Sequence, residues 1–122
     1  MGKHILLIEH HEPLRRLLGG YFSGNYQVTG ARDAVEALAW LGKGLQPDII
    51  LAGARLPHIS TSQLLATLRN SGLHSGIPVI VLIDRPEEAA RFLSMGAAAC
   101  ASKPFDPLVL RKQLEELSPQ PA

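Results

Sequence analysis

The hydrophobic residues of this chain follow two different spacings, which alternate from one end to the other. Some short runs, such as Ile5-Leu6-Leu7-Ile8, are wholly apolar, as in strands that are covered on both faces of a sheet, whereas residues 26–30 form a weaker run. Between them, apolar residues recur every three or four positions, as on one face of a helix. The runs predict strands at residues 5–8, 26–30, 48–53, 78–83 and 97–102, each followed by a helix. This alternation predicts an α/β protein with a doubly wound, five-stranded parallel sheet and five helices.

Polar residues and prolines mark where the predicted helices begin. Asp33 and Ser60 are each followed three positions later by Glu or Gln, which is the pattern of a capping box. Pro13 stands where the first turn of a helix tolerates proline. The sequence Asp84-Arg85-Pro86-Glu87 is also typical of a helix start, with Asp84 as the capping residue.

Composition and charge narrow the class of protein. The 122 residues carry 12 Lys and Arg against 11 Asp and Glu, so the net charge favours neither nucleic acid nor an anionic membrane. No apolar run approaches the roughly 20 residues of a membrane span, and the chain opens on a strand rather than on a signal peptide. The single cysteine, Cys100, cannot form an internal disulfide, which suits a reducing compartment. We expect one cytoplasmic domain over residues 1–118, with residues 119–122 as a tail or the start of a linker.

The carboxyl ends of the predicted strands bring a small set of polar residues to one edge of the sheet. In doubly wound folds, ligands bind at this edge. It collects Glu9, His10 and His11 after the first strand, residues 53–55 after the third, 83–84 after the fourth and 102–103 after the fifth. Asp48 is excluded, because it starts the third strand and lies about 15 Å from this edge at about 3.3 Å per residue.

A series of short motifs runs along the chain in a fixed order. They are Ile5-Leu6-Leu7-Ile8-Glu9 with Pro13 and Arg15, Ala31-Arg32-Asp33-Ala34-Val35-Glu36-Ala37-Leu38, Pro47-Asp48-Ile49-Ile50-Leu51, Leu56-Pro57, Pro78-Val79-Ile80-Val81-Leu82 and Lys103-Pro104-Phe105. No single motif is specific, but their order and spacing resemble the receiver domain of bacterial two-component response regulators over residues 3–117. The resemblance implies the flavodoxin-like (βα)5 receiver fold.

The resemblance also implies where the chemistry of the family would lie. Receivers bind magnesium with an acidic pair after the first strand, and they accept a phosphoryl group on an aspartate that ends the third. Here Glu9 stands at the first acidic position, His10 at the second and Gly53 at the acceptor position. Glycine has no side chain to accept a phosphoryl group, and imidazole is a poor ligand for magnesium, which requires several hard oxygen ligands. We therefore expect no metal, no cofactor and no aspartyl phosphate at Gly53.

The residues that sense the phosphoryl group in the family are also changed. The Ser or Thr that ends the fourth strand is Ile83 here, and the aromatic switch residue of the fifth strand is Cys100. The family lysine after the fifth strand is kept as Lys103. We expect Lys103 to pair with Glu9, Arg55 to reach into the vacated pocket, and the peptide bond after Lys103 to be cis, as it often is in the family.

Two groups of residues leave a chemical alternative open. Asp84 follows Ile83 directly and could be a displaced phosphoacceptor, although its place at a helix start favours capping. His10 and His11 beside Glu9 could suggest a transition-metal site. Adjacent side chains at a strand end diverge, however, which favours solvated loop histidines.

Together, these substitutions predict a receiver-like domain that signals by binding another protein and not by phosphorylation. We expect no enzymatic activity, no direct contact with nucleic acid or membrane, and a monomer or weak dimer. Two alternatives stay open. The domain could be the input half of a transcription or nucleic-acid-associated regulator, or it could be phosphorylated at a displaced acceptor such as Asp84.

The surface for the protein partner is expected on the last third of the chain. In the family, the fourth helix, fifth strand and fifth helix transmit the signal, and this region corresponds to about residues 84–117 here. With Ile83 and Cys100 in place of the moving residues of the family, the surface is expected to be locked in one state. The candidate contacts are Arg91, Phe92, Leu93 and Met95.

Overall fold

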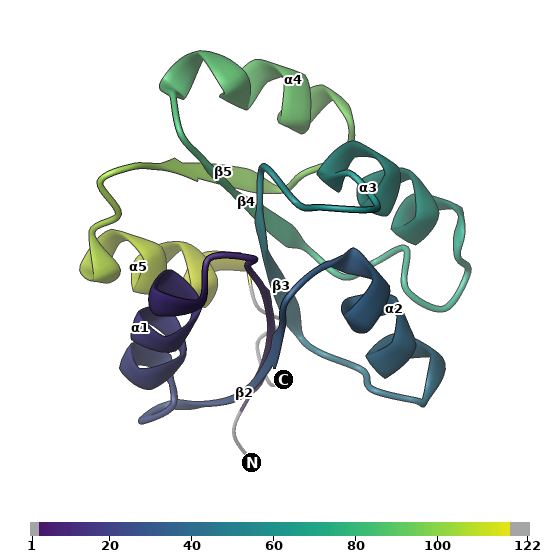
Figure 1. Cartoon of the computed structure of the whole chain (residues 1–122), viewed down its shortest axis with the longest axis horizontal. Helices are drawn as coiled ribbons and strands as arrows, with labels where there is room; N and C mark the ends of the chain where they lie inside the picture. Colours follow the sequence, from purple (N-terminus) through teal and green to yellow (C-terminus); the bar gives the residue numbers. More distant parts are fainter. Residues whose placement is uncertain (1–2, 118–122) are drawn as a thin grey trace.

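Five parallel strands form the centre of the computed structural model, which describes residues 3–117 (Figure 1). The strands are β1 (Lys3–Ile8), β2 (Tyr26–Ala31), β3 (Ile49–Gly53), β4 (Val79–Ile83) and β5 (Ala99–Ser102), and their order in the sheet is β2-β1-β3-β4-β5. The helices are α1 (Glu12–Phe22), α2 (Ala34–Gly42), α3 (Thr61–Asn70), α4 (Ala89–Ser94) and α5 (Pro107–Leu117), with a 3₁₀ turn, η1 (Pro86–Glu88), before α4. The predicted doubly wound parallel sheet is therefore confirmed. The predicted tail at residues 119–122 lies outside the described residues.

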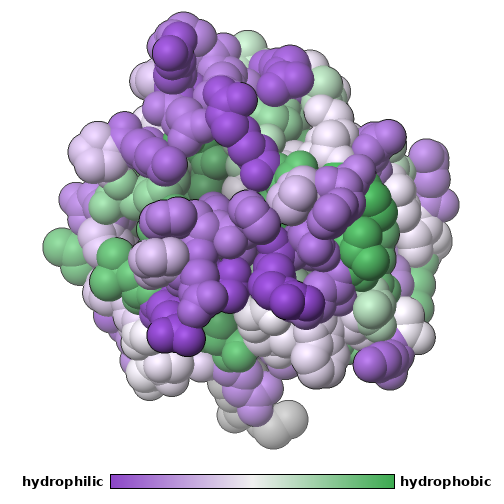
Figure 2. All heavy atoms as spheres, in the orientation of Figure 1, coloured by the Kyte–Doolittle hydropathy of each residue, from purple (hydrophilic) through white to green (hydrophobic). Residues whose placement is uncertain are grey.

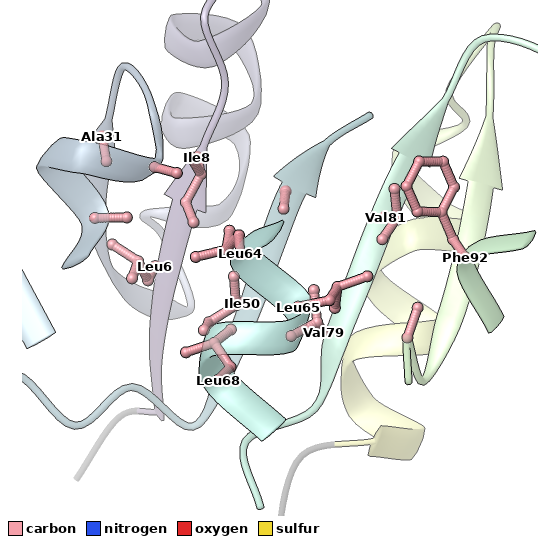
Figure 3. Close-up of a cluster of buried hydrophobic side chains, with 14 of the residues drawn as sticks. Leu6, Ile8, Ala31, Ile50, Leu64, Leu65, Leu68, Val79, Val81 and Phe92 are labelled. Carbon is pink, nitrogen blue, oxygen red and sulfur yellow. The ribbon is translucent and has the colours of Figure 1, made fainter. Parts of the chain in front are cut away.

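Helices cover both faces of the sheet, which explains why β3, β4 and the second half of β1 are apolar and buried at every position. Figure 1 shows α1 and α5 side by side on one face, and α2, α3 and α4 on the other. In β1, Ile5 and Leu7 pack with α1 and α5, whereas Leu6 and Ile8 pack against the opposite layer. Successive residues of a strand point to opposite faces, so both sets are buried. Figure 3 shows the second of these two cores, with leucines of α3 packed onto β1, β3 and β4.

Two of the predicted helix caps are present in the structure. Ser60 accepts a hydrogen bond from the backbone N–H of Gln63, and the Gln63 side chain accepts one from the backbone of Ser60, which completes a capping box. Asp33 accepts from the backbone N–H of Glu36 at 2.8 Å. These bonds fix the points at which α3 and α2 leave the sheet.

The short α4 corrects part of the predicted partner surface. Phe92 is only 1% exposed and packs in the core, so its prediction as a surface contact is wrong. Met95 and Cys100 are half-buried and pack against the same core. Arg91 and Leu93 are exposed, and they remain the available side chains of the predicted surface.

The strand register aligns the carboxyl ends of four strands at one edge of the sheet. Ile8 pairs with Ala52, and Ile83 pairs with Ser102, so the segments that follow β1, β3, β4 and β5 emerge together. Asp48 lies at the opposite edge, where its carboxylate accepts a hydrogen bond from the backbone N–H of His4. The exclusion of Asp48 from the site is confirmed. Within residues 3–117, no helix is both long enough and apolar enough to cross a membrane.

Candidate functional site

A polar cleft of about 270 Å³ lies at this carboxyl edge. It brings together the predicted site residues Glu9, His10, Arg55, Asp84 and Lys103, and it is also lined by His11 and Phe105. Two further predicted positions, Gly53 and Ile83, are buried at the ends of β3 and β4 and contribute no polar atom of a side chain to the cleft. The sequence therefore predicted the location of the site and most of its lining.

Asp84 is the centre of the charges in this cleft. Its Oδ2 lies 2.6 Å from Nε of Arg55, and its Oδ1 lies 3.0 Å from Nζ of Lys103. The carboxylate thus joins the loops that follow β3, β4 and β5. The prediction that Asp84 caps a helix is wrong. Glu88 instead accepts hydrogen bonds from the backbone N–H groups of Asp84 and Arg85. The predicted entry of Arg55 into the pocket is correct, although most of its side chain stays exposed.

The predicted ion pair between Lys103 and Glu9 is wrong. The ammonium of Lys103 contacts Asp84, which follows β4, the strand next to β5. Glu9 follows β1, and both β3 and β4 lie between β1 and β5. The sheet order therefore gives Lys103 a nearer carboxylate than Glu9. The predicted cis peptide bond between Lys103 and Pro104 is present.

Glu9 turns toward Gly53 instead. Its Oε2 accepts a hydrogen bond from the backbone N–H of His11 at 2.9 Å. A Cβ atom added to Gly53 would lie only 2.8 Å from Oε1 of Glu9, a separation that real Cβ atoms essentially never show. The carboxylate of Glu9 therefore occupies the space that any side chain at the end of β3 would need.

Thr61 is a buried polar residue near the site that sequence reasoning missed. It is 1% exposed, and its hydroxyl donates a hydrogen bond to the carbonyl oxygen of Gly53 at 2.5 Å. This bond ties the first turn of α3 to the end of β3. No sequence signal distinguished Thr61, because it follows the capping residue Ser60 and reads as an ordinary first residue of a helix.

The side chains of the cleft do not fit a magnesium ion. Glu9 is the one acidic residue directly after β1, and one of its oxygens already accepts a hydrogen bond. Both oxygens of Asp84 are engaged by cations, and His10 offers imidazole where magnesium prefers oxygen. Within residues 3–117, no group of three or more His, Cys, Asp and Glu side chains is arranged to hold a metal ion.

The bridge around Asp84 predicts a measurable pKa. The hydrogen bond from Arg55, followed by that from Lys103, lowers the pKa of Asp84 below its ordinary value. A lowered pKa means that the bridge stabilises the fold above about pH 4 and that this contribution is lost as the pH falls through the folded-state pKa. The Arg55 and Lys103 side chains are largely exposed, so solvent screens both ion pairs and their contribution to stability is small.

We expect Arg55→Met to raise the pKa of Asp84 more than Lys103→Met does, in carboxyl ¹³C NMR titrations. Arg32→Met is the matched control, because Arg32 pairs with Glu36 on α2 and does not line the cleft. A pKa of Asp84 that is equal in the wild type and in both cleft variants would contradict the bridge.

The comparisons with known proteins assign the chain to a family. The model of the response regulator receiver domain matches residues 5–115, and the fold and the position of the cleft agree with that match. The chain belongs to the response regulator receiver family, whose members act in two-component signalling.

The relatives carry this domain within longer proteins. The chain is 32% identical over 109 residues to the Regulator of RpoS of Escherichia coli, which covers 88% of this chain and 32% of that protein. It is 33% identical over 110 residues to the phosphate regulon transcriptional regulatory protein PhoB of Klebsiella pneumoniae, covering 88% of this chain and 48% of that one. The chain thus spans about a third to a half of these two relatives.

The structural neighbours show the same fold. A putative response regulator from Chloroflexus aurantiacus superposes with a TM-score of 0.91 at 23% identity, covering 96% of this chain and 98% of that one. The chemotaxis response regulator CheY4 of Vibrio cholerae gives 0.86 at 22% identity, covering 96% and 99%. At these identities the likeness establishes the fold alone.

Proposed function

We propose that this chain is a receiver domain that works without phosphorylation on aspartate, through contact with another protein of a two-component pathway. One observation carries the proposal. The end of β3, where the family resemblance places the phosphoacceptor, is Gly53, and the carboxylate of Glu9 fills the space beside it. No side chain is available there to attack a phosphoryl donor, and none can be added without displacing Glu9.

The bridge around Asp84 supports the same proposal over the alternative of a displaced acceptor. A carboxylate attacks phosphorus through a free oxygen, but both oxygens of Asp84 are bonded to Arg55 and Lys103. The lowered pKa of Asp84 also indicates a carboxylate stabilised in its ionised form, which is a weaker nucleophile. Lys103, the residue that contacts the phosphoryl group in the family, is already paired within the chain.

A domain of this kind acts by presenting a surface of fixed shape. The bridge holds the loops after β3, β4 and β5 together without any added group, so the neighbouring surface does not depend on a phosphoryl group. On α4, the exposed side chains of Arg91 and Leu93 are available for contact with a partner. Relatives of this chain include the sensor histidine kinase RcsC and the regulator PhoB, which indicates kinases and regulators of such pathways as the class of partner.

The test is incubation with acetyl phosphate and magnesium, followed by intact-mass spectrometry at neutral pH. We expect no mass gain under conditions that fully modify a receiver with an acceptor aspartate, which serves as the positive control. Because aspartyl phosphate is labile, the measurement is made without acid quenching. A stoichiometric gain of one phosphoryl group would refute the proposal. Loss of that gain in Asp84→Asn would then identify Asp84 as the acceptor.

A further inference from the structure

α1 carries apolar side chains on two faces, although the sheet needs only one. Leu18 and Phe22 are buried against the sheet. Pro13, Leu17 and Tyr21, which are spaced four residues apart, line the outer face of the same helix, and Leu17 is 68% exposed. The core therefore does not explain the outer row, which we call the α1 ridge (Pro13, Leu17 and Tyr21).

Hollows lie on both sides of the α1 ridge. On one side, a mainly apolar groove of about 580 Å³ separates Leu17 from Pro104 and Phe105, which follow β5. On the other side, a shallow hollow of about 720 Å³ is lined by Pro13, Leu17 and the charged side chains of Glu12 and Arg16. The groove is open rather than enclosed, so it suits a helix better than a small molecule, which is normally buried in its pocket.

Hydrophobic side chains continue beyond the groove onto α5. Leu108 is 71% exposed and Val109 is 53% exposed, both in the first turn of α5. Figure 2 shows hydrophobic side chains at the left edge of the molecule, where Figure 1 places the start of α5. Neighbouring apolar side chains that the fold leaves exposed on one face mark a contact site for a protein.

The charged residues beside the α1 ridge could pair with the same residues of a second copy of the helix. Glu12 and Arg16 are one turn apart, with exposed side chains that form an ion pair at 2.7 Å. Positions 12 and 16 are centred on residue 14, and positions 13 and 17 are centred on residue 15. A second α1 that runs antiparallel, with a two-fold axis between residues 14 and 15, would therefore bring Glu12 within one residue of the position facing Arg16, and Leu17 within one residue of the position facing Pro13, in both directions.

We propose that the α1 ridge is the contact surface between two copies of this chain, packed antiparallel about a two-fold axis. Leu17 of each copy enters the hollow beside the ridge of the other, and Glu12 of each copy pairs with Arg16 of the other. Such an interface is isologous, so every contact occurs twice. It lies on a different surface from the partner contacts of α4, so its test does not depend on the proposed function.

The test is a charge swap, measured by sedimentation velocity over a range of protein concentrations. We expect the wild type to dimerise in the micromolar range. Glu12→Arg leaves only positive charges at positions 12 and 16, and Arg16→Glu leaves only negative ones, so each variant alone should repel its own copy. Each is expected to raise the dimer dissociation constant at least about tenfold, because the lost pair occurs twice in the interface.

Mixing the two variants is the decisive arm of the experiment. An equimolar mixture restores opposite charges across the interface, so we expect a heterodimer with an affinity within a few-fold of the wild type. Lys112→Glu, an exposed charge reversal on α5 away from the groove, is the control and should not change the dimer. Leu17→Ser is expected to abolish the dimer, with circular dichroism and thermal melting showing that the fold is kept.

Three results would overturn the proposal. They are a wild type that stays monomeric at millimolar concentration, charge variants that dimerise as well as the wild type, and a mixture that does not recover the dimer. The first and third would assign the α1 ridge to a different protein as occupant. Phosphorylation of the domain by acetyl phosphate would refute the proposed function but leave this proposal standing.

Discussion

Replacing Phe92 with alanine is expected to lower the free energy of unfolding by about 3–5 kcal/mol, the range measured for large aromatic truncations in a core. Phe92 is 1% exposed and packs between α4 and the sheet in the core shown in Figure 3. Its removal leaves a cavity under a helix of only six residues, which has few other anchors. Urea denaturation, with the slope of the transition compared between variants, measures the change.

The next residue provides the matched control. Leu93 is 46% exposed on the outer side of the same helix, so Leu93→Ala is expected to change stability by less than about 0.5 kcal/mol. If the surface of α4 binds a partner, Leu93→Ala should weaken binding without unfolding the domain. Equal destabilisation by the two substitutions would contradict the orientation of α4 described here.

Gly53→Asp is expected to destabilise the domain by about 2–4 kcal/mol at neutral pH and to leave it unphosphorylated. The new side chain would enter a buried position beside the carboxylate of Glu9, and a buried charge without a partner is costly. Like charge and burial both raise the pKa of such a carboxyl group above about 3.9. The penalty is therefore small below that pH and grows as the pH rises through the raised value.

Three further variants isolate the cause of this loss. Gly53→Ala only displaces the flexible end of Glu9 and should cost about 1 kcal/mol, which is the value of the hydrogen bond from His11 that would be lost. Adding Glu9→Gln to Gly53→Asp removes the repulsion and is expected to recover part of the stability. Gly72→Asp, at an exposed site with no atom near an added Cβ, should be nearly neutral.

Acetyl phosphate should still add no mass to Gly53→Asp. Ile83 offers no hydroxyl to the phosphoryl oxygens, and Lys103 stays paired with Asp84. Robust modification of this single variant would show that the glycine alone blocks the reaction. It would also show that the remaining changes in the cleft are secondary.

The sheet and the location of the cleft could be predicted from the sequence because both rest on simple regularities. A run that is apolar at every position, such as Ile5-Leu6-Leu7-Ile8, indicates a strand with both faces buried. Such a strand belongs to a sheet that is covered by helices on both sides. Parallel strands then bring their carboxyl ends to the same edge. The residues that follow them, including Glu9, Asp84 and Lys103, meet there whatever their pairing.

The pairing itself could not be predicted, because it depends on distances that spacing does not supply. The cleft holds two carboxylates, Glu9 and Asp84, with which Lys103 could pair. Lys103 pairs with Asp84 because Asp84 follows β4, the strand next to β5. The inward orientation of Phe92 could not be predicted from the sequence for a different reason. The 3₁₀ turn before α4 has three residues per turn instead of 3.6, so it shifts the helical phase that would assign Phe92 inward and Leu93 outward.

If the domain works without an acceptor aspartate, as proposed, the packing of Glu9 against Gly53 also bears on how easily one could be introduced. The codons for glycine and aspartate can differ by a single nucleotide, so the acceptor is one mutation away in sequence. In the structure, that mutation meets an occupied site, because Glu9 has its own hydrogen bond and fills the space. A lineage that gained phosphorylation would have to change His10, Gly53 and Ile83, and Gly53→Asp alone is expected to destabilise the domain. Under the proposed function, the neighbouring residues thus make an acceptor aspartate hard to introduce by a single substitution.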